Sequence, residues 1–225
     1  MPAPASSSNV VTTAEVAGGH GIDLVRYPRL RHYGGDMGFL PWSRHRPQKA
    51  VRRAVRSHRT DSLLAQAPLV TSTGEAWAFA TRAELLLISA PEVPSGHDDG
   101  ESRGAPSVVV HREWSDVDRA TYDQESNVIR VHWVDGDEPT PLPLDGRGSV
   151  LPQVLRERVQ WSVVLAEPVK LPDGRSARVA VRRRADGELF SQVIGQGDLD
   201  VNDPDIAGVI DAAEARVRNA AGLPA

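Results

Sequence analysis

The sequence predicts an α+β protein in which about seven short strands are closed by an amphipathic helix and followed by a C-terminal β-β-β-α unit. Short segments with alternating or continuous apolar residues, such as EAWAFAT and NVIRVHWV, are typical of strands. Turn dipeptides such as Asp135-Gly136 and Asp186-Gly187 separate them. Apolar residues recur with helical spacing in three segments, at residues 47–59, 149–161 and 204–221.

The N-terminal part divides into a polar tail and a basic segment. Residues 1–25 are mostly small and polar, so we expect a disordered tail. Residues 26–60 form a basic arm and helix, and RYPRLRHYGGDMGFLPW at 26–42 mixes aromatic residues with Gly and Pro, which predicts an irregular arm. The helix is expected to begin at Pro47, because proline in a first turn loses no needed hydrogen-bond donor.

The predicted basic helix has a narrow apolar stripe. Ala50, Val51, Ala54 and Val55 have the spacing of one helix face. The remaining faces carry the basic residues Lys49, Arg52, Arg53, Arg56 and Arg59. We therefore expect a helix that packs through a small apolar contact and exposes a broad cationic surface.

Residues 61–161 contain the seven predicted strands and their closing helix. The strands are expected at residues 63–70, 75–81, 85–89, 107–112, 114–122, 127–134 and 140–144. A polar loop at 91–106 separates the third strand from the fourth. The helix at 149–161 has one apolar side, with Ser149 as its expected cap and Pro152 in its first turn.

Residues 162–225 form the expected C-terminal unit. Its three strands are predicted at residues 162–171, 177–183 and 188–194. Asp203 and Pro204 supply a cap and a first-turn proline for the last helix, and Gly222 ends it.

Two sets of segments carry a resemblance to known proteins. GEAWAFATRAELLLIS and HREWSDVDRATYDQESNVIRVHWVDG, with seven strands before one helix, resemble a pleckstrin-homology-like (PH-like) barrel. RERVQWSVVLAEPVKL, RVAVRRRADGELFSQV and DLDVNDPDI resemble an uncharacterised family common in actinobacteria. The likeness covers roughly residues 40 to 222. It implies a PH-like seven-stranded barrel capped by a helix over residues 61–161, and it brings no activity, substrate or catalytic residue.

The resemblance favours a platform for proteins, peptides or surfaces. Lipid-binding pleckstrin domains generally carry several basic residues around the first hairpin. Here the turn at residues 71–75 has none, so recognition of a phosphoinositide headgroup is not expected.

Charge is unevenly distributed along the chain. Residues 26–59 hold ten Arg or Lys and one acid, a net charge of +9, which leaves −13 for the remainder of a chain whose total is −4. Such asymmetry is typical of an anionic partner or of a basic segment that contacts an acidic body.

Composition limits the class and the location of the protein. The chain has no cysteine, which excludes disulfides, thiol catalysis and Cys-based zinc sites. It has no long apolar run and no secretory signal pattern, so we expect a cytoplasmic protein without a transmembrane segment.

We expect a non-enzymatic binding or adaptor protein that contacts its partner through the basic helix. The predicted contact residues are Arg44, Arg46, Lys49, Arg52, Arg53, Arg56 and Arg59. An acidic protein surface, its own or that of a partner, is the first interpretation. Nucleic acid is the second. An anionic membrane surface, with Phe39, Leu40 and Trp42 as an apolar wedge, is the third.

Candidate sites for chemistry are weak, and we predict no cofactor and no metal. Asp198, Asp200 and Asn202 have the spacing of a calcium loop, but the loop's glycine and its twelfth-position glutamate are missing, so these acids are expected at the positive end of the last helix. His97, Asp98 and Asp99 lie in a predicted loop, where ligands are poorly organised for a metal.

An enzyme is the alternative that remains. His111 or His132 could pair with Asp116 or Asp118 for proton transfer. Arg182, Arg183 and Arg184 either extend the basic surface or only keep a strand end soluble.

Overall fold

The computed structural model describes residues 46–72, 74–90, 105–195, 199 and 203–224. In this part of the chain it is an α+β protein with three antiparallel sheets and three α-helices. The expected tail at 1–25, the arm to residue 45 and the loop at 91–104 lie outside the described residues.

The first sheet has four strands in the order β1-β2-β3-β4. Their bounds are Leu63–Leu69, Glu75–Thr81, Glu84–Ala90 and Ser107–Glu113. Both faces of the sheet are covered, which explains why β2 and β3 are buried almost throughout rather than at alternate residues. Ala78, Ala80, Leu85 and Leu87 face the main core, and their neighbours Trp77, Phe79, Leu86 and Ile88 face α1 (Lys49–His58).

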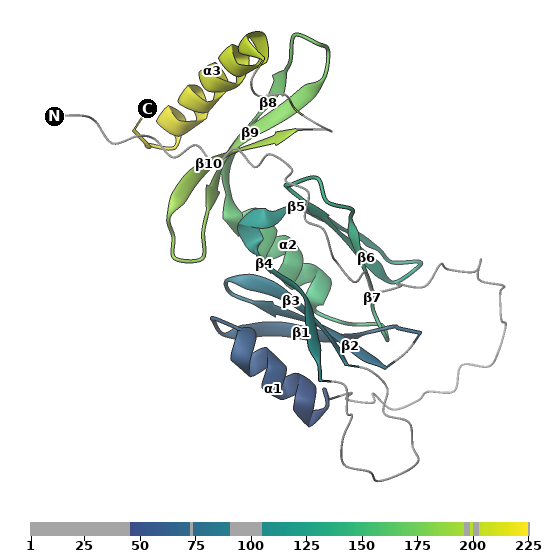
Figure 1. Cartoon of the computed structure of the whole chain (residues 1–225). Coiled ribbons are helices and arrows are strands. Elements are labelled where there is room, and N and C mark those ends of the chain that lie inside the picture. The colour runs from purple at the N-terminus through teal and green to yellow at the C-terminus, as the bar shows by residue number, and fades with distance from the viewer. Residues whose placement is uncertain (1–45, 73, 91–104, 196–198, 200–202, 225) are drawn as a thin grey trace.

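The second sheet has three strands in the order β5-β6-β7. They span Val117–Asp123, Val128–Trp133 and Thr140–Pro143. Helix α2 (Leu151–Ser162) inserts Leu151 and Leu155 into the core that both sheets share. Figure 1 shows α1 and α2 on opposite faces of the first sheet.

The first seven strands do not form a closed barrel in the described residues. They divide into the two sheets, which a single antiparallel bridge joins between Leu69 and Leu144. The division occurs at a 3-10 turn, η1 (Trp114–Asp116), which takes the place of the first residues of the strand predicted at 114–122. The Trp114 ring is buried and its Nε1 donates to the Thr81 carbonyl at 3.1 Å, so the turn is held to the first sheet while the chain leaves it.

The C-terminal unit packs α3 (Pro204–Ala220) on a sheet in the order β10-β9-β8. The strands span Val163–Lys170, Ser176–Arg183 and Leu189–Gly195 for β8, β9 and β10. One helix stripe and one sheet face make a separate core, which includes Val179, Val181, Ile206, Ile210 and Val217. The expected strand and helix positions are confirmed here, including the cap, because the Asp203 side chain accepts the Asp205 N–H at 2.9 Å.

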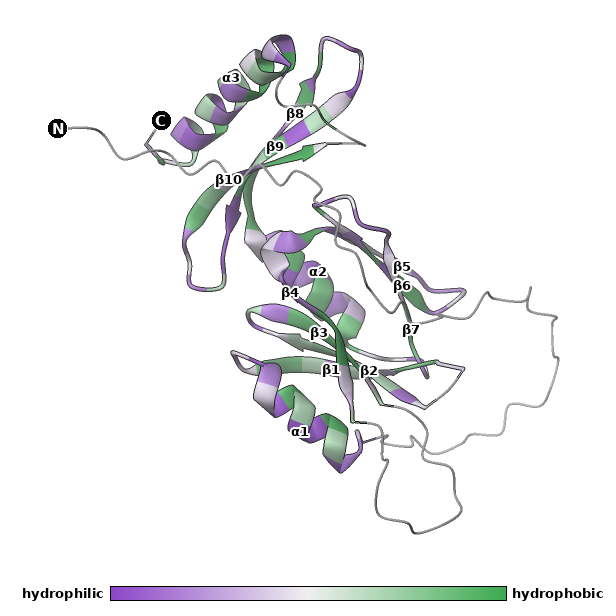
Figure 2. Ribbon diagram, in the orientation of Figure 1, coloured by the Kyte–Doolittle hydropathy of each residue, from purple (hydrophilic) through white to green (hydrophobic). Residues whose placement is uncertain are grey.

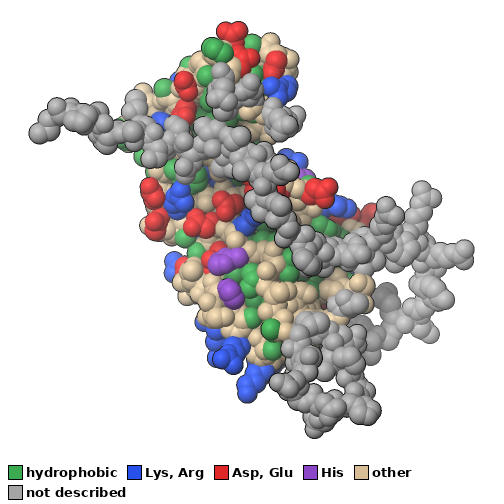
Figure 3. All heavy atoms as spheres, in the orientation of Figure 1, with side chains coloured by type: hydrophobic (Ala, Val, Ile, Leu, Met, Phe, Trp, Pro, Cys, Tyr) green, Lys and Arg blue, Asp and Glu red, His purple; other side chains and the backbone are tan. Residues whose placement is uncertain are grey.

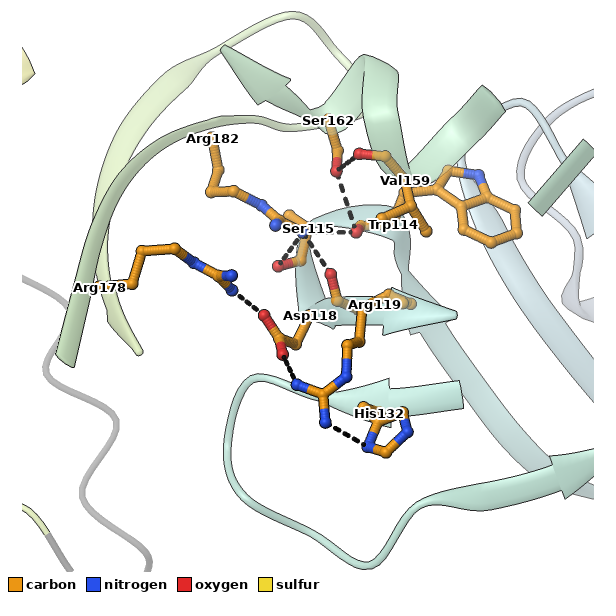
Figure 4. Close-up of polar contacts among 10 residues, drawn as sticks. Trp114, Ser115, Asp118, Arg119, His132, Val159, Ser162, Arg178 and Arg182 are labelled. Atoms are coloured by element: carbon orange, nitrogen blue, oxygen red, sulfur yellow. Dashed lines mark hydrogen bonds and ion pairs between the residues drawn. The ribbon is translucent and has the colours of Figure 1, made fainter. Parts of the chain in front are cut away.

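Arg182 connects the C-terminal sheet to the first unit. Its side chain is 1% exposed, and its Nη2 donates to the carbonyl oxygens of Trp114, Ser115 and Val117 at 2.8, 3.1 and 2.6 Å (Figure 4). The hydroxyl of Ser162, at the end of α2, donates to the Trp114 carbonyl at 3.3 Å as well. Arg182 therefore lies inside the protein and does not extend a basic surface.

Candidate functional site

Helix α1 is fixed to the first sheet through its apolar stripe, as the sequence predicted. Val51 and Val55 are 0% and 5% exposed and pack on the sheet face that carries Trp77, Phe79 and Leu86. The contact is apolar, so it holds the helix without using any of its positive charges.

The ends of α1 are held by two glutamates of the sheet. Glu75 Oε1 accepts the N–H of Gln48 at 3.2 Å, just before the helix. Glu84 Oε1 accepts the N–H of Thr60 at 2.7 Å, just after it. Together with the apolar stripe, these bonds define which side of α1 faces away from the sheet.

The basic residues of α1 lie on the side away from the sheet. Lys49, Arg52, Arg53 and Arg56 have i, i+3, i+4 and i+7 spacing, which places them on one face opposite Val51 and Val55. Val51 and Val55 are buried and these four residues are exposed, so the helix has an apolar side and a basic side. We call these four residues the cationic face. Figure 3 shows Lys and Arg side chains grouped over α1, and Figure 2 shows its mixture of hydrophilic and hydrophobic residues.

The cationic face has no acidic partner among the residues that the structure describes. All four side chains are exposed, as are the flanking Arg46 and Arg59, and none forms an ion pair with a described Asp or Glu. The predicted contact residue Arg44 lies outside the described residues.

A cleft of about 390 Å³ lies beside the end of α1. It was not predicted. It is lined by Thr60 after α1, by the start of β3, by the end of β4 and η1, and by the turn between β9 and β10. The lining residues are Thr60, Ala83, Glu84, His111, Arg112, Glu113, Asp116, Arg184 and Ala185.

Glu84 and His111 form the best-organised polar pair of the cleft. The Glu84 side chain is 5% exposed, and its Oε2 lies 2.8 Å from His111 Nε2. The His111 side chain is 40% exposed, and its ring contacts that of His58 on α1 edge to face, with 6.3 Å between centroids. The structure thus joins His111 to Glu84 rather than to Asp116 or Asp118.

Asp116 is an acid in an unfavourable environment for charge. Burial raises the pKa of its carboxyl, and the positive charge of Arg112 partly opposes that rise. Arg112 itself donates to Asp135 and Asp137 and lies over the Trp133 ring, 4.6 Å from its centroid.

The other histidine candidate does not join an acid. His132 Nδ1 lies 3.3 Å from Arg119 Nη2, as Figure 4 shows. Burial, and then the charges of Arg119 and Arg130, lower the pKa of His132. Asp118 is instead bound by Arg178 and Arg119. A proton-transfer pair of His132 with Asp116 or Asp118 is therefore not formed.

The other two arginines of the 182–184 run each pack over an aromatic ring, and the structure describes no metal site. Arg183 lies over Trp161 and Arg184 over Phe190, 4.9 and 4.6 Å from the ring centroids. In the described ranges no group of three or more His, Asp or Glu side chains is placed to hold a metal ion. His97, Asp98 and Asp99 lie outside those ranges, as do the three candidate calcium ligands Asp198, Asp200 and Asn202.

No helix within the described residues has the length and apolar character needed to cross a membrane. Comparison of the chain with models of known protein families, with curated proteins and with solved structures finds no match.

Sequence reasoning missed Glu84, although a signal was present. In RAELLLIS an acid stands directly before four apolar residues of a buried strand. A carboxylate at such a position needs hydrogen-bond donors, because burial without them is costly. Which donors it finds, Thr60 and His111, depends on the tertiary fold.

Proposed function

We propose that this protein is a non-enzymatic binding protein whose cationic face contacts an acidic surface of a partner protein. The observation that carries the proposal is the arrangement of α1. Its apolar stripe packs against the first sheet. Lys49, Arg52, Arg53 and Arg56 are exposed together on the other side, and none of them pairs with a described acid. Opposite charges on two surfaces steer association and favour the matching partner.

We further propose that the first seven strands and α2 form a PH-like platform that presents α1 to the partner, in the cytoplasm. The order of the elements supports this interpretation. A sheet of four strands precedes a sheet of three and then a helix that packs into their shared core. The bridge between Leu69 and Leu144 joins the sheets at one corner only, so the platform is an open variant of such a fold.

Nucleic acid is a less favourable partner. The cationic face spans only about 10 Å along the helix axis, which allows few phosphate contacts. The α1 residues beside it, Ala50 and Ser57, offer no aromatic ring for a base to stack on.

An anionic membrane is a less favourable partner as well. Four basic side chains near such a surface contribute at most about 4 kcal/mol in total. Stable membrane attachment generally needs a second, apolar signal. Within the described part of α1, the exposed face carries no large apolar side chain.

The proposal is tested by charge reversal with a matched control. The test variant changes Arg52, Arg53 and Arg56 to Glu. The control changes Arg130, Arg147 and Arg156 to Glu, which alters the net charge equally at exposed arginines of β6, the segment after β7, and α2. Each full-length protein is used to capture partners from lysate with and without nuclease treatment, and bound protein, nucleic acid and lipid are measured.

We expect the wild type and the control to capture the same protein partner. The test variant should bind this partner about tenfold more weakly than the wild type, which corresponds to ~1.4 kcal/mol of binding free energy. Binding should then be reproduced with the purified partner and weaken with salt, because exposed charges are screened. Equal capture by both variants would overturn the proposal. Capture of mainly nucleic acid or mainly lipid through the cationic face would replace it with the corresponding alternative.

A further inference from the structure

Strand β10 is an edge strand without the features that usually keep sheet edges from pairing with each other. It lies at one edge of the C-terminal sheet, where β9 is the only described strand that pairs with it (Figure 1). Its sequence, LFSQVIG, contains no charged residue and no proline, and its register with β9 is unbroken from end to end. Such an edge is a template for pairing with a further strand.

The other edge strands of the three described sheets each carry a protective feature. Proline occurs in β1, β7 and β8, at Pro68, at Pro141 and Pro143, and at Pro168. The pairings of β4 with β3 and of β5 with β6 each contain a break in register, and both edge strands carry charged residues. Proline, irregular register and charge all hinder the addition of a strand. Among the described edges, β10 is therefore the one best suited to pair.

The large apolar side chains of β10 are only partly covered on both faces of its sheet. Leu189 and Val193 lie on the face that carries α3, and α3 contacts β10 less than it contacts β8 or β9. Phe190 and Ile194 alternate with them and lie on the opposite face. All four side chains are half-buried. A further strand beside β10 would bury apolar surface on both faces at once.

Gln192, the central residue of β10, has a polar atom without a partner. The residue is 7% exposed, and its Oε1 is buried and accepts no hydrogen bond. A buried amide oxygen in this state is costly. Antiparallel pairing of two β10 strands about a two-fold axis at Gln192 places the two copies of this residue directly opposite each other, with their Cβ atoms about 4.5–5.5 Å apart. Nε2 of one amide can then donate to Oε1 of the other.

We propose that a second copy of this chain pairs with β10, so that two C-terminal sheets join into one antiparallel sheet in a two-fold symmetric dimer. An interface of this symmetry requires a surface that is complementary to itself, and β10 meets that requirement. Centred on Gln192, the pairing places Phe190 of each copy opposite Ile194 of the other, and aromatic with β-branched pairs stabilise neighbouring strands. The dimer does not depend on the partner of the cationic face, since α1 belongs to another sheet.

The mass of the full chain in solution tests the dimer. Sedimentation equilibrium is measured from about 1 to 100 µM, because association depends on concentration. We expect the mass of two chains at the upper end, and the mass of one chain there would overturn the proposal. Ile194→Lys adds a charge to the edge and should weaken dimerisation at least about tenfold. The matched control is Val164→Lys, at an exposed position of β8 at the opposite edge, which should dimerise as the wild type does.

An introduced thiol identifies the strand at the dimer axis, because the chain has no cysteine of its own. Under mild oxidation Gln192→Cys should form a disulfide-linked dimer, since a residue on the axis lies opposite its own copy and within reach of a disulfide. Val164→Cys should form far less of it, although that position is more exposed. Equal or faster linking through Val164→Cys would overturn β10 as the interface, as would a folded Ile194→Lys variant that dimerises like the wild type. The thiol variants decide the outcome even if Ile194→Lys fails to fold.

Discussion

The side chain of Arg182 donates a hydrogen bond of 2.6 Å to the main-chain carbonyl oxygen of Val117, across the junction between the C-terminal sheet and the start of β5. The same nitrogen, Nη2, also donates to the carbonyl oxygens of Trp114 and Ser115. Burial, and then the charge of Arg178, lower the pKa of Arg182 to about 10, so it stays protonated at neutral pH. A charged guanidinium thus satisfies a turn whose carbonyls point into the junction.

Replacing Arg182 with Met should destabilise the protein by about 3 kcal/mol, because buried carbonyl oxygens lose a charged donor and keep the cost of burial. Urea unfolding followed by circular dichroism measures the change. The matched control is Arg130→Met at an exposed position, which should lie within about 0.5 kcal/mol of the wild type. Equal stability of the two variants would show that Arg182 does not hold the junction.

Replacing Asp116 with Asn should raise the free energy of unfolding at neutral pH. Burial raises the pKa of Asp116 in the folded protein, so its ionised form is less stable there than in the unfolded chain. That cost is complete above the folded pKa, decreases as pH falls through it and is gone below the lower, unfolded pKa, whereas Asn never carries it. The difference between variant and wild type should therefore shrink on acidification. Urea midpoints measured across pH decide this, and a less stable variant at neutral pH would contradict it.

Replacing Val51 with Ala should cost about 2 kcal/mol and loosen α1 from the sheet. The side chain is fully buried against the first sheet, so the change removes apolar contact and leaves a cavity. Hydrogen exchange of the α1 amides reports local release of the helix. Arg53→Ala, on the exposed face of the same helix, should change stability by less than about 0.5 kcal/mol. Comparable losses in the two variants would mean that the stripe does not anchor α1.

Replacing Glu84 with Ala should cost about 1–3 kcal/mol, since the Thr60 N–H and His111 Nε2 both lose their acceptor. Glu84→Gln should cost less, because its amide oxygen can still accept the Thr60 N–H. Thermal unfolding of both variants gives the order. If Gln were as damaging as Ala, the contact with Thr60 would not be the one that matters.

Local structure was predictable because local periodicity determines it. The α1 stripe, the strand positions and the Asp203 cap of α3 all follow from neighbouring residues. The division of seven strands into two sheets was not predictable. It depends on three residues of 3-10 helix at Trp114–Asp116, held by a bond between Trp114 and Thr81, which are 33 positions apart.

The two candidate sites also differ in how far the sequence could predict them. The residues of the cationic face could be named from the sequence, since they lie within one helix. The cleft was not, because Glu84 and His111 are 27 positions apart and Arg184 comes from the C-terminal unit. Arg182 was expected at the surface. The alternation along β9 places it on the face of Ala180, opposite Val179 and Val181, and only the packing of the two units buries that face.

The measurement that tests the central claim most directly is the amount of partner protein captured by the Arg52, Arg53 and Arg56 to Glu variant relative to the Arg130, Arg147 and Arg156 to Glu variant, at equal folded concentration. The cationic face predicts a ratio of about one tenth or less, with both variants melting within a few degrees of the wild type. A ratio near one would contradict the claim and would leave α1 as a structural cover of the first sheet.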